Sequence, residues 1–287
     1  MSVDVDETFT LGGDLPVRRL GLGTGGLVGS GYWGPRAERH ASVALLRTAV
    51  ARGVTLIDTA DNYGPHLAEE LVAEALHPYG EQLVVSTKGG VVRTGPDQWH
   101  AAGRPEELRS MCEASLRRLR LDRIDLYQLH RFDPAVPPAE QLGTLAELRA
   151  EGKIRHIGLN TVTADQLGEA LSLVPVASVQ NPYNLLDRSS AELLALCEER
   201  GIAFLPYYPL GSGALTRESA AALTAVATQH GASTGQIALA WLLQHSPVLC
   251  PTPGTGSPEH LAENLDAATV HLTPHEMTLL NGLADPD

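Results

Sequence analysis

Four side chains able to hold or transfer protons lie at or just beyond the ends of short apolar stretches. Asp58 ends VTLID, Lys88 ends QLVVSTK and His130 ends IDLYQLH. Tyr63 lies in TADNYG, shortly after the first of these stretches. A free phenol has a pKa of about 10, and a nearby ammonium favours its phenolate. A carboxylate would hold that ammonium and an imidazole would bind a substrate oxygen, so the four residues indicate proton transfer by a tyrosine.

Each of these side chains also has a structural interpretation. Asp58 could cap a helix, Lys88 could extend its ammonium to solvent, and Tyr63 or His130 could simply be packed. We favour chemistry because all four fall at the ends of three consecutive strands, where an unpaired charge is costly. The sequence shows no nucleophile beside a base and no metal-ligand spacing, so we expect no metal. The four groups cannot move a hydride by themselves, so a redox partner is required.

The elements that must position these residues alternate regularly along the chain. Apolar strands alternate with stretches of helical periodicity, which predicts eight β-α repeats and a (β/α)8 TIM barrel. A doubly wound open sheet uses the same alternation, but no linker divides the repeats. We therefore expect one domain over residues 1–287, with a short N-terminal β-hairpin at 8–18 and the barrel at 19–287. Among the helices, we expect 67–76, 105–119 with Pro105 in its first turn, one capped by Thr163 and one stopped by Gly152.

The stretch GLGTGG, residues 21–26, spells the dinucleotide-binding fingerprint G-x-G-x-x-G. That motif must open directly into a helix and be followed, about 20 residues on, by an acidic residue. Here a glycine-rich loop containing Pro35 follows, and the later segment ASVALLRTAV carries no acidic residue. We interpret the stretch as a loop after the first strand, where glycines allow close approach to the backbone.

Composition excludes several classes of function. The chain has 287 residues and a formal net charge of −13, which opposes binding to nucleic acid and to anionic membranes. Its three cysteines form no C-x-x-C pair, as is typical of a reducing compartment. The acidic start of the sequence does not resemble a signal peptide, and no apolar run is long enough to span a bilayer. We expect a cytoplasmic protein.

The ordered motifs resemble the aldo-keto reductases along nearly the whole chain. They are GLGTGG, IDTADNYG, STKGG, YQLH, KIRHIGL, VQNPYNL, PYYPLGSG and PGTGSPEHLAENL. Within that family, DNYGPH and EALHPYG resemble the bacterial pyridoxal reductase and pyridoxine dehydrogenase branch. The resemblance implies a barrel that binds NADP(H) in an extended pose across its rim. It also implies a catalytic tetrad of Asp58, Tyr63, Lys88 and His130, with Tyr63 protonating the carbonyl oxygen as hydride arrives.

The same resemblance assigns cofactor contacts along the chain. Gly23 and Thr24 would lie beside the nicotinamide ribose, Tyr207 would stack on the ring, and Gln180 would orient the carboxamide. Asp58 would also contact the cofactor. The family usually has Ser-Asn where this chain has Asn160 and Thr161, and we expect these to keep the function with altered geometry. The remaining contacts fall at the pyrophosphate (Leu210, Gly211, Ser212) and at the adenine (Glu263, Asn264).

The site implied for the 2′-phosphate departs further from the family pattern. Where the family offers a Lys or Arg, this chain has Gly254, Gly256 and His260. A phosphate would then meet the hydroxyls of Thr255 and Ser257, the N-terminus of the next helix and one histidine. The sequence therefore predicts a weakened preference for NADP(H) and tolerance of NAD(H).

A small-molecule carbonyl is the expected substrate. The chain is shorter than many relatives beyond its last helix, which predicts an open pocket. Aromatic residues would border that pocket, although loop packing explains them equally well: Tyr32, Trp33, Trp99 and Tyr208.

Three functions compete. The first is NAD(P)H-dependent reduction of an aldehyde or ketone, with Tyr63 as general acid. The second is a dehydrogenase acting on one alcohol, such as a sugar or pyridoxine. The third, from another class, is a cofactor-binding regulatory subunit with little turnover, as in the potassium-channel β subunits that resemble this family. The intact tetrad disfavours the third function. The sequence leaves the substrate and the oligomeric state open.

Overall fold

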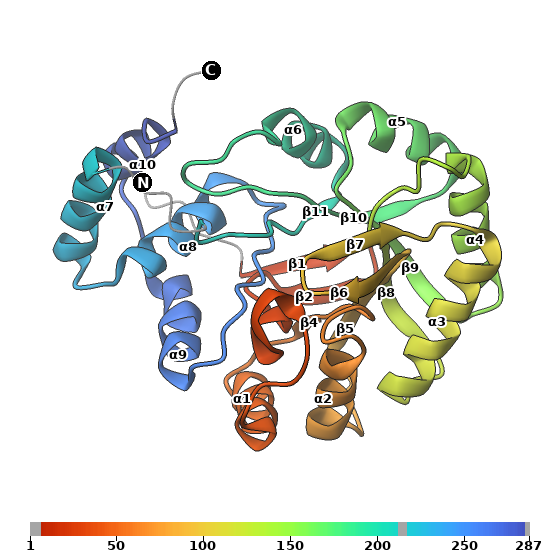
Figure 1. The fold of residues 1–287 in the computed structure, drawn as a ribbon. Coiled ribbons are helices and arrows are strands. Elements are labelled where there is room, and N and C mark those ends of the chain that lie inside the picture. Colours follow the sequence, from red (N-terminus) through yellow and green to blue (C-terminus); the bar gives the residue numbers. More distant parts are fainter. Residues whose placement is uncertain (1–6, 212–216, 285–287) are drawn as a thin grey trace.

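The core of the molecule is a sheet of seven parallel strands. A computed structural model describes residues 7–211 and 217–284, and orders the sheet β11-β10-β9-β8-β5-β4-β3. Figure 1 shows the strands at the centre, with helices on both sides. The strands are β3 (Leu22–Gly23), β4 (Leu56–Asp58), β5 (Val84–Gly89), β8 (Ile124–Leu129), β9 (Ile154–Asn160), β10 (Val176–Gln180) and β11 (Ala203–Phe204).

The segment 249–254 occupies the eighth position of the ring. Leu249 forms a bridge to Phe204 in β11, and Gly254 forms a bridge to Gly23 in β3, both parallel. This segment contains the prolines of CPTP, which lack the N–H donors of a regular strand. The edges of the sheet are thus joined through isolated bridges, an arrangement consistent with the (β/α)8 barrel that the sequence predicts.

Helices follow most of the strands. They are α1 (Arg39–Ala51), α2 (Leu67–Leu76), α3 (Pro105–Leu119), α4 (Pro138–Ala150), α5 (Ala164–Leu173), α6 (Ala191–Arg200), α7 (Arg217–His230), α8 (Thr234–His245), α9 (Pro258–Asp266) and α10 (Pro274–Asn281).

Several local predictions about these helices are confirmed. The helices expected at 67–76 and 105–119 have those bounds, and Pro105 lies in the first turn of α3. Thr163 caps α5 by accepting a hydrogen bond from Gln166 N, and Gly152 follows α4 with a positive φ. Helix α7, by contrast, was not expected, so two helices rather than one precede the eighth segment.

The N-terminal hairpin is confirmed as β1 (Thr8–Leu11) and β2 (Leu15–Arg18), which pair antiparallel. Its turn contains Gly12 and Gly13, both at positive φ. Leu11 and Val17 are buried in a cluster with residues at the amino-terminal ends of the strands, including Leu56 and Val84. The hairpin therefore closes the end of the sheet opposite to the predicted active residues.

A second hairpin was not expected. Strands β6 (Val91–Gly95) and β7 (Gln98–Ala101) pair antiparallel directly after β5. Their sequence alternates buried and exposed residues in β6 around a Gly-Pro-Asp turn, a local signal that could have predicted them. Arg93 of β6 donates to the carbonyls of Gly31 and Tyr32, at 2.7 Å and 2.8 Å, which holds this hairpin against the loop after β3.

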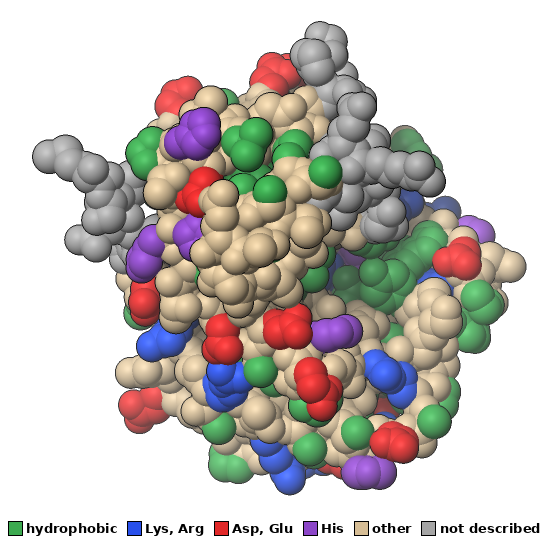
Figure 2. Space-filling model, turned by 90° about the vertical axis from the view of Figure 1, so that its left-hand side faces the viewer, with side chains coloured by type: hydrophobic (Ala, Val, Ile, Leu, Met, Phe, Trp, Pro, Cys, Tyr) green, Lys and Arg blue, Asp and Glu red, His purple; other side chains and the backbone are tan. Residues whose placement is uncertain are grey.

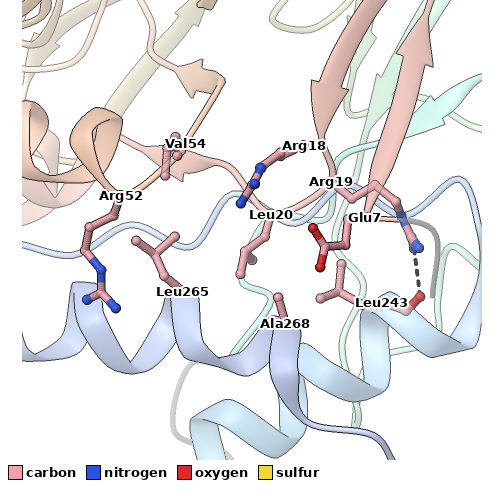
Figure 3. Close-up of a pocket in the computed structure, with 10 residues that line it drawn as sticks. Glu7, Arg18, Arg19, Leu20, Arg52, Val54, Leu243, Leu265 and Ala268 are labelled. Carbon is pink, nitrogen blue, oxygen red and sulfur yellow. Dashed lines mark hydrogen bonds between the residues drawn. The ribbon is translucent and has the colours of Figure 1, made fainter. Parts of the chain in front are cut away.

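Arg19 ties the first hairpin to the eighth segment. Its guanidinium is buried and donates to the carbonyls of Leu249 at 3.0 Å, Leu243 at 2.8 Å and Ser246 at 2.5 Å. Figure 3 shows the bond to Leu243 beside a small cavity of about 60 Å³, which Arg18 also lines. The carbonyls of Leu243 and Ser246 lie at the carboxyl end of α8, where a helix leaves such groups without internal partners.

Replacing Arg19 with methionine is expected to lower the free energy of unfolding by about 3 kcal/mol, because it removes a guanidinium that donates to three buried carbonyls. The neighbouring Arg18 has an exposed side chain and provides the matched control. Arg18→Met should change the free energy by less than about 0.5 kcal/mol. Urea unfolding followed by circular dichroism measures both, and equal effects of the two variants would contradict the role of Arg19.

Candidate active site

A cavity of about 770 Å³ opens at the carboxyl ends of the strands. Its wall includes the last residues of several strands, among them Asp58 of β4, Asn160 of β9 and Gln180 of β10. Tyr63 and His130 also line it. This volume falls in the range of about 300–1,000 Å³ that is usual for small-molecule and cofactor sites.

Lys88 is fully buried beneath this cavity, in an ion pair with Asp58 of its wall. Its Nζ is 2.7 Å from Asp58 Oδ2 and also donates to the carbonyl of Thr59 at 2.9 Å. Burial lowers the pKa of Lys88 below its ordinary value, and the charge of Asp58 opposes that shift. Neighbouring strands β4 and β5 bring the two side chains together, with Asp58 opposite Ser86 in the parallel register.

Two amides complete the surroundings of Asp58. Gln180 Nε2 donates to Oδ2 and Gln128 Nε2 donates to Oδ1, both at 3.0 Å. Gln128 is fully buried in β8 and was not expected at this site. The carboxylate thus accepts from three side chains, which fixes its orientation.

Tyr63 lies close to the ion pair, but its pKa is raised, whereas the sequence predicted that a nearby ammonium would lower it. Lys88 Nζ is 5.4 Å from the centroid of the Tyr63 ring. Burial raises the pKa of Tyr63 above its ordinary value, and the negative charge of Asp58 raises it further. The expectation that an ammonium would lower this pKa is wrong for the protein alone, because the loss of hydration penalises the phenolate. Tyr63 therefore remains a protonated phenol.

His130 is held as a neutral imidazole. Burial lowers its pKa well below 6.5, and the positive charge of Lys88 contributes. Asn62 lies directly before Tyr63, and its Nδ2 is 3.0 Å from His130 Nδ1. An amide NH₂ can only donate, so Nδ1 must accept and the proton of the neutral ring must sit on Nε2. Sequence reasoning missed Asn62, since nothing local relates it to a residue in another strand.

A chain of amides and hydroxyls continues from Asp58 along the cavity wall. Asn160 Nδ2 donates to Gln180 Oε1 at 2.8 Å, and Thr161 Oγ1 donates to Asn160 Oδ1 at 2.7 Å. Tyr207 lines the same cavity and is half-buried. Amides beside an aromatic ring fit a planar ring that bears a carboxamide, as a nicotinamide does.

The loop after β3 approaches the eighth segment closely. A Cβ at Gly23 would lie 2.6 Å from the carbonyl oxygen of Thr252, so this position requires glycine. Thr24 is fully buried and its hydroxyl bonds to Thr59 Oγ1 at 2.8 Å. Gly23 lines the cavity, whereas the Thr24 side chain fastens the loop to the end of β4.

The other expected cofactor residues are distributed as follows. Leu210 and Gly211 line the cavity, and Ser212 lies outside the described residues. Thr255 is buried and its hydroxyl accepts from Ser257 N at 3.0 Å. Residues of α9 lie beyond the cavity wall, with His260 and Glu263 exposed and Asn264 buried.

The aromatic residues expected at the rim separate into two groups. Tyr32, Trp99 and Tyr208 line the cavity. The Trp99 ring contacts the His130 ring edge to face, with centroids 5.9 Å apart. Trp33 is not part of the wall. The guanidinium carbon Cζ of Arg93 lies 5.5 Å from the centroid of the Trp33 ring.

A second buried network supports β5 from outside the barrel. Glu69 of α2 is fully buried and accepts from Thr87 Oγ1 and from Arg118 Nε, both at 2.6 Å. Thr87 immediately precedes Lys88, so this network fixes the strand that presents the ammonium.

Two other types of site are absent from residues 7–211 and 217–284. None of their helices is long and apolar enough to cross a membrane. No group of three or more His, Cys, Asp or Glu side chains among them could hold a metal ion. On the face shown in Figure 2, acidic and basic side chains are interspersed.

Comparison with known proteins assigns the chain to a family of oxidoreductases. Residues 19–285 match the aldo/keto reductase family, and the chain belongs to that family. It is 40% identical to pyridoxine 4-dehydrogenase of Escherichia coli strain K12, over 97% of this chain and 98% of the relative. It is 46% identical to an uncharacterised oxidoreductase of Schizosaccharomyces pombe, over 95% of this chain and 89% of the relative.

A solved structure shares the fold over nearly the full length. An aldo-keto reductase from Klebsiella pneumoniae in complex with NADPH superposes with a TM-score of 0.83 at 29% identity. The match covers 98% of this chain and 96% of that one.

The tautomer of His130 can be tested directly. In the native protein, long-range ¹⁵N correlation spectra should show a neutral ring protonated on Nε2. Asn62→Asp replaces the donor at Nδ1 with an acceptor, so the proton should move to Nδ1 and the pKa of His130 should rise by about one unit. His245, which does not contact Asn62, serves as an internal control. A native ring protonated on Nδ1 would contradict the assignment.

Proposed function

We propose that the protein is an NADP(H)-dependent oxidoreductase that reduces an aldehyde or ketone to an alcohol. The observation that carries the proposal is the placement of Tyr63 and His130 on one cavity above the buried Lys88–Asp58 pair. Family membership and the NADPH complex of the Klebsiella relative support it. We further propose that residues 1–287 act as one domain, with the hairpin at 8–18 and a (β/α)8 barrel at 19–287.

The residues of the chain divide the chemistry between them. When bound, the reduced nicotinamide supplies a hydride to the carbonyl carbon. Tyr63 donates its phenolic proton to the carbonyl oxygen, and His130 Nε2–H donates a hydrogen bond to the same oxygen. Lys88 lies near enough to stabilise the negative charge left on Tyr63, and Asp58 keeps Lys88 charged and in place.

The cofactor is proposed to extend from Tyr63 towards α9. Asn160 and Gln180 would hold the carboxamide, Tyr207 would stack on the ring, and Gly23, Thr24 and Asp58 would border the ribose. The pyrophosphate would lie along Leu210, Gly211 and Ser212. The adenosine half would meet Thr255, His260, Glu263 and Asn264. NAD(H) remains the alternative that the sequence predicts.

Two observations favour an aromatic or otherwise planar substrate. Tyr32, Trp99 and Tyr208 form an aromatic part of the wall, and the 40% identical relative is a pyridoxine dehydrogenase. Oxidation of pyridoxine or a similar alcohol is therefore the second candidate, since the same site serves both directions. A regulatory subunit with little turnover is the third.

The test follows the absorbance of NADPH and of NADH with a panel of aldehydes and ketones that includes pyridoxal. Oxidation of the cofactor by one or more of them supports a reductase. Turnover seen only with NADP⁺ and an alcohol supports the dehydrogenase direction. Tight cofactor binding with no turnover in either direction would support the regulatory role and contradict the proposed enzyme.

Tyr63→Phe keeps the ring and removes the proton that the mechanism transfers. We expect kcat to fall by about 10²- to 10⁴-fold, the usual range for loss of a general acid, while the Kd for NADPH changes by less than about threefold. Tyr79→Phe is the matched control, because Tyr79 OH bonds to the carbonyl of Leu119 outside the cavity. Retained turnover in Tyr63→Phe would refute the role of Tyr63.

The raised pKa of Tyr63 predicts the pH dependence. A general acid must be protonated, and a phenol whose pKa lies above the ordinary value of about 10 stays protonated through the neutral range. For reduction, kcat/KM should therefore be flat from about pH 6.5 to about pH 9. Alcohol oxidation needs the phenolate and should rise about tenfold per pH unit over that range. Initial rates in both directions measure this, and reduction that falls with an apparent pKa near neutrality would contradict it.

A further inference from the structure

The side chain of Arg36 reaches the segment 254–260, where the family usually has a Lys or Arg and this chain has none. It lies in the loop between β3 and α1, and its Nη1 donates to the carbonyl of Gly26 at 2.6 Å. The guanidinium then lies against Gly256, where an added Cβ would overlap Nη1. Two loops that are far apart in the sequence are thus packed together. The Arg36 side chain occupies the space beside Gly256, which has no side chain of its own.

This contact gives Gly256 a different meaning from the one the sequence suggested. A side chain at position 256 would displace the guanidinium, so the glycine makes room for Arg36. The positive charge absent from 254–260 is therefore present, but it comes from the neighbouring loop between β3 and α1. A position-by-position comparison of sequences could not show that Arg36 supplies the cation missing from 254–260.

The guanidinium remains available to an anion. Arg36 is exposed, and no described carboxylate lies within ion-pair distance of it. By contrast, the nearby Arg39 pairs with Glu74 at 2.7 Å. A guanidinium has several N–H donors in a planar fork that matches phosphate, and the bond to Gly26 uses only one of them.

The position of Arg36 suits the outer end of an extended cofactor. Gly26 and Gly254 both line the cavity, on walls that meet where Gly26 approaches Thr255. Helix α9 begins just beyond, with Ser257 as its N-cap. The carboxylate of Glu259 is also near, but Ser257 Oγ donates to it at 2.6 Å. A phosphate here would meet one guanidinium and the favourable end of the helix dipole.

We propose that Arg36 binds the 2′-phosphate of NADP(H) and gives the protein its preference over NAD(H). The assignment rests on the proposed function. It replaces the tolerance of NAD(H) expected from the sequence with discrimination by a residue outside the segment that the family pattern indicates.

The test compares binding of NADPH and NADH by isothermal titration calorimetry, without substrate. Native protein should bind NADPH at least about tenfold more tightly than NADH. Arg36→Ala should weaken NADPH binding by roughly 10- to 100-fold and NADH binding by less than about threefold. Arg39→Ala, a matched exposed arginine that already has carboxylate partners, should leave both affinities unchanged.

Two further variants separate charge from loop structure. Gly256→Ala should reduce the preference for NADPH, because its Cβ moves the guanidinium without removing it. Gly256→Lys in the Arg36→Ala background should restore the preference, since it returns a cation to the same place.

Each outcome is decisive. Equal binding of both cofactors by native protein would overturn the assignment and leave the proposed function intact. An equal loss of NADPH and NADH affinity in Arg36→Ala would assign Arg36 a purely structural role through Gly26. Failure of native protein to bind either cofactor would instead refute the proposed function.

Discussion

The buried pair between Lys88 and Asp58 is the constraint on which the rest of the site depends. Removing an ammonium and a carboxylate from water costs several kcal/mol for each, and their attraction offsets this only with good geometry and further hydrogen bonds. The protein supplies these from Gln128, Gln180 and the carbonyl of Thr59. These groups come from β8, β10 and the turn after β4, and the pair itself joins β4 to β5, so the sheet must be assembled before the pair is stabilised.

The same burial sets the protonation states around the pair. A site that excludes water raises the pKa of Tyr63 and lowers the pKa of His130, so both groups are neutral hydrogen-bond donors near pH 7. Among Asp58, Tyr63, Lys88 and His130, the positive charge therefore lies on Lys88, beneath the cavity floor. Asn62 fixes which nitrogen of the His130 ring can donate a hydrogen bond, because its amide donates to Nδ1 and leaves the proton on Nε2. Burial keeps Tyr63 protonated as an acid, and burial together with the Asn62 amide keeps His130 neutral with a proton on Nε2.

Local patterns predicted the parts of the molecule that local interactions determine. The helices at 67–76 and 105–119, the cap at Thr163 and the hairpin at 8–18 follow from periodicity, capping and turn residues. Asp58, Lys88 and His130 could be recognised because polar residues ended apolar strands. Gln128 and Asn62 could not, since their roles depend on contacts between separate strands. The predicted direction of the Tyr63 pKa shift was wrong, because the degree of burial is a property of the folded chain.

The exchange between Arg36 and Gly256 shows why cofactor preference is harder to predict than the catalytic groups. In the proposed mechanism Tyr63 and His130 must each occupy one place, because proton transfer requires contact with the reacting atoms. A phosphate requires only a cation within reach, and an arginine side chain on either wall of the cavity can provide it. A glycine at a site that usually holds a cation therefore has two opposite meanings, a lost charge or space for a charge from elsewhere. Here the packing of the two loops favours the second meaning, because the position that lacks a side chain is the one against which the guanidinium lies.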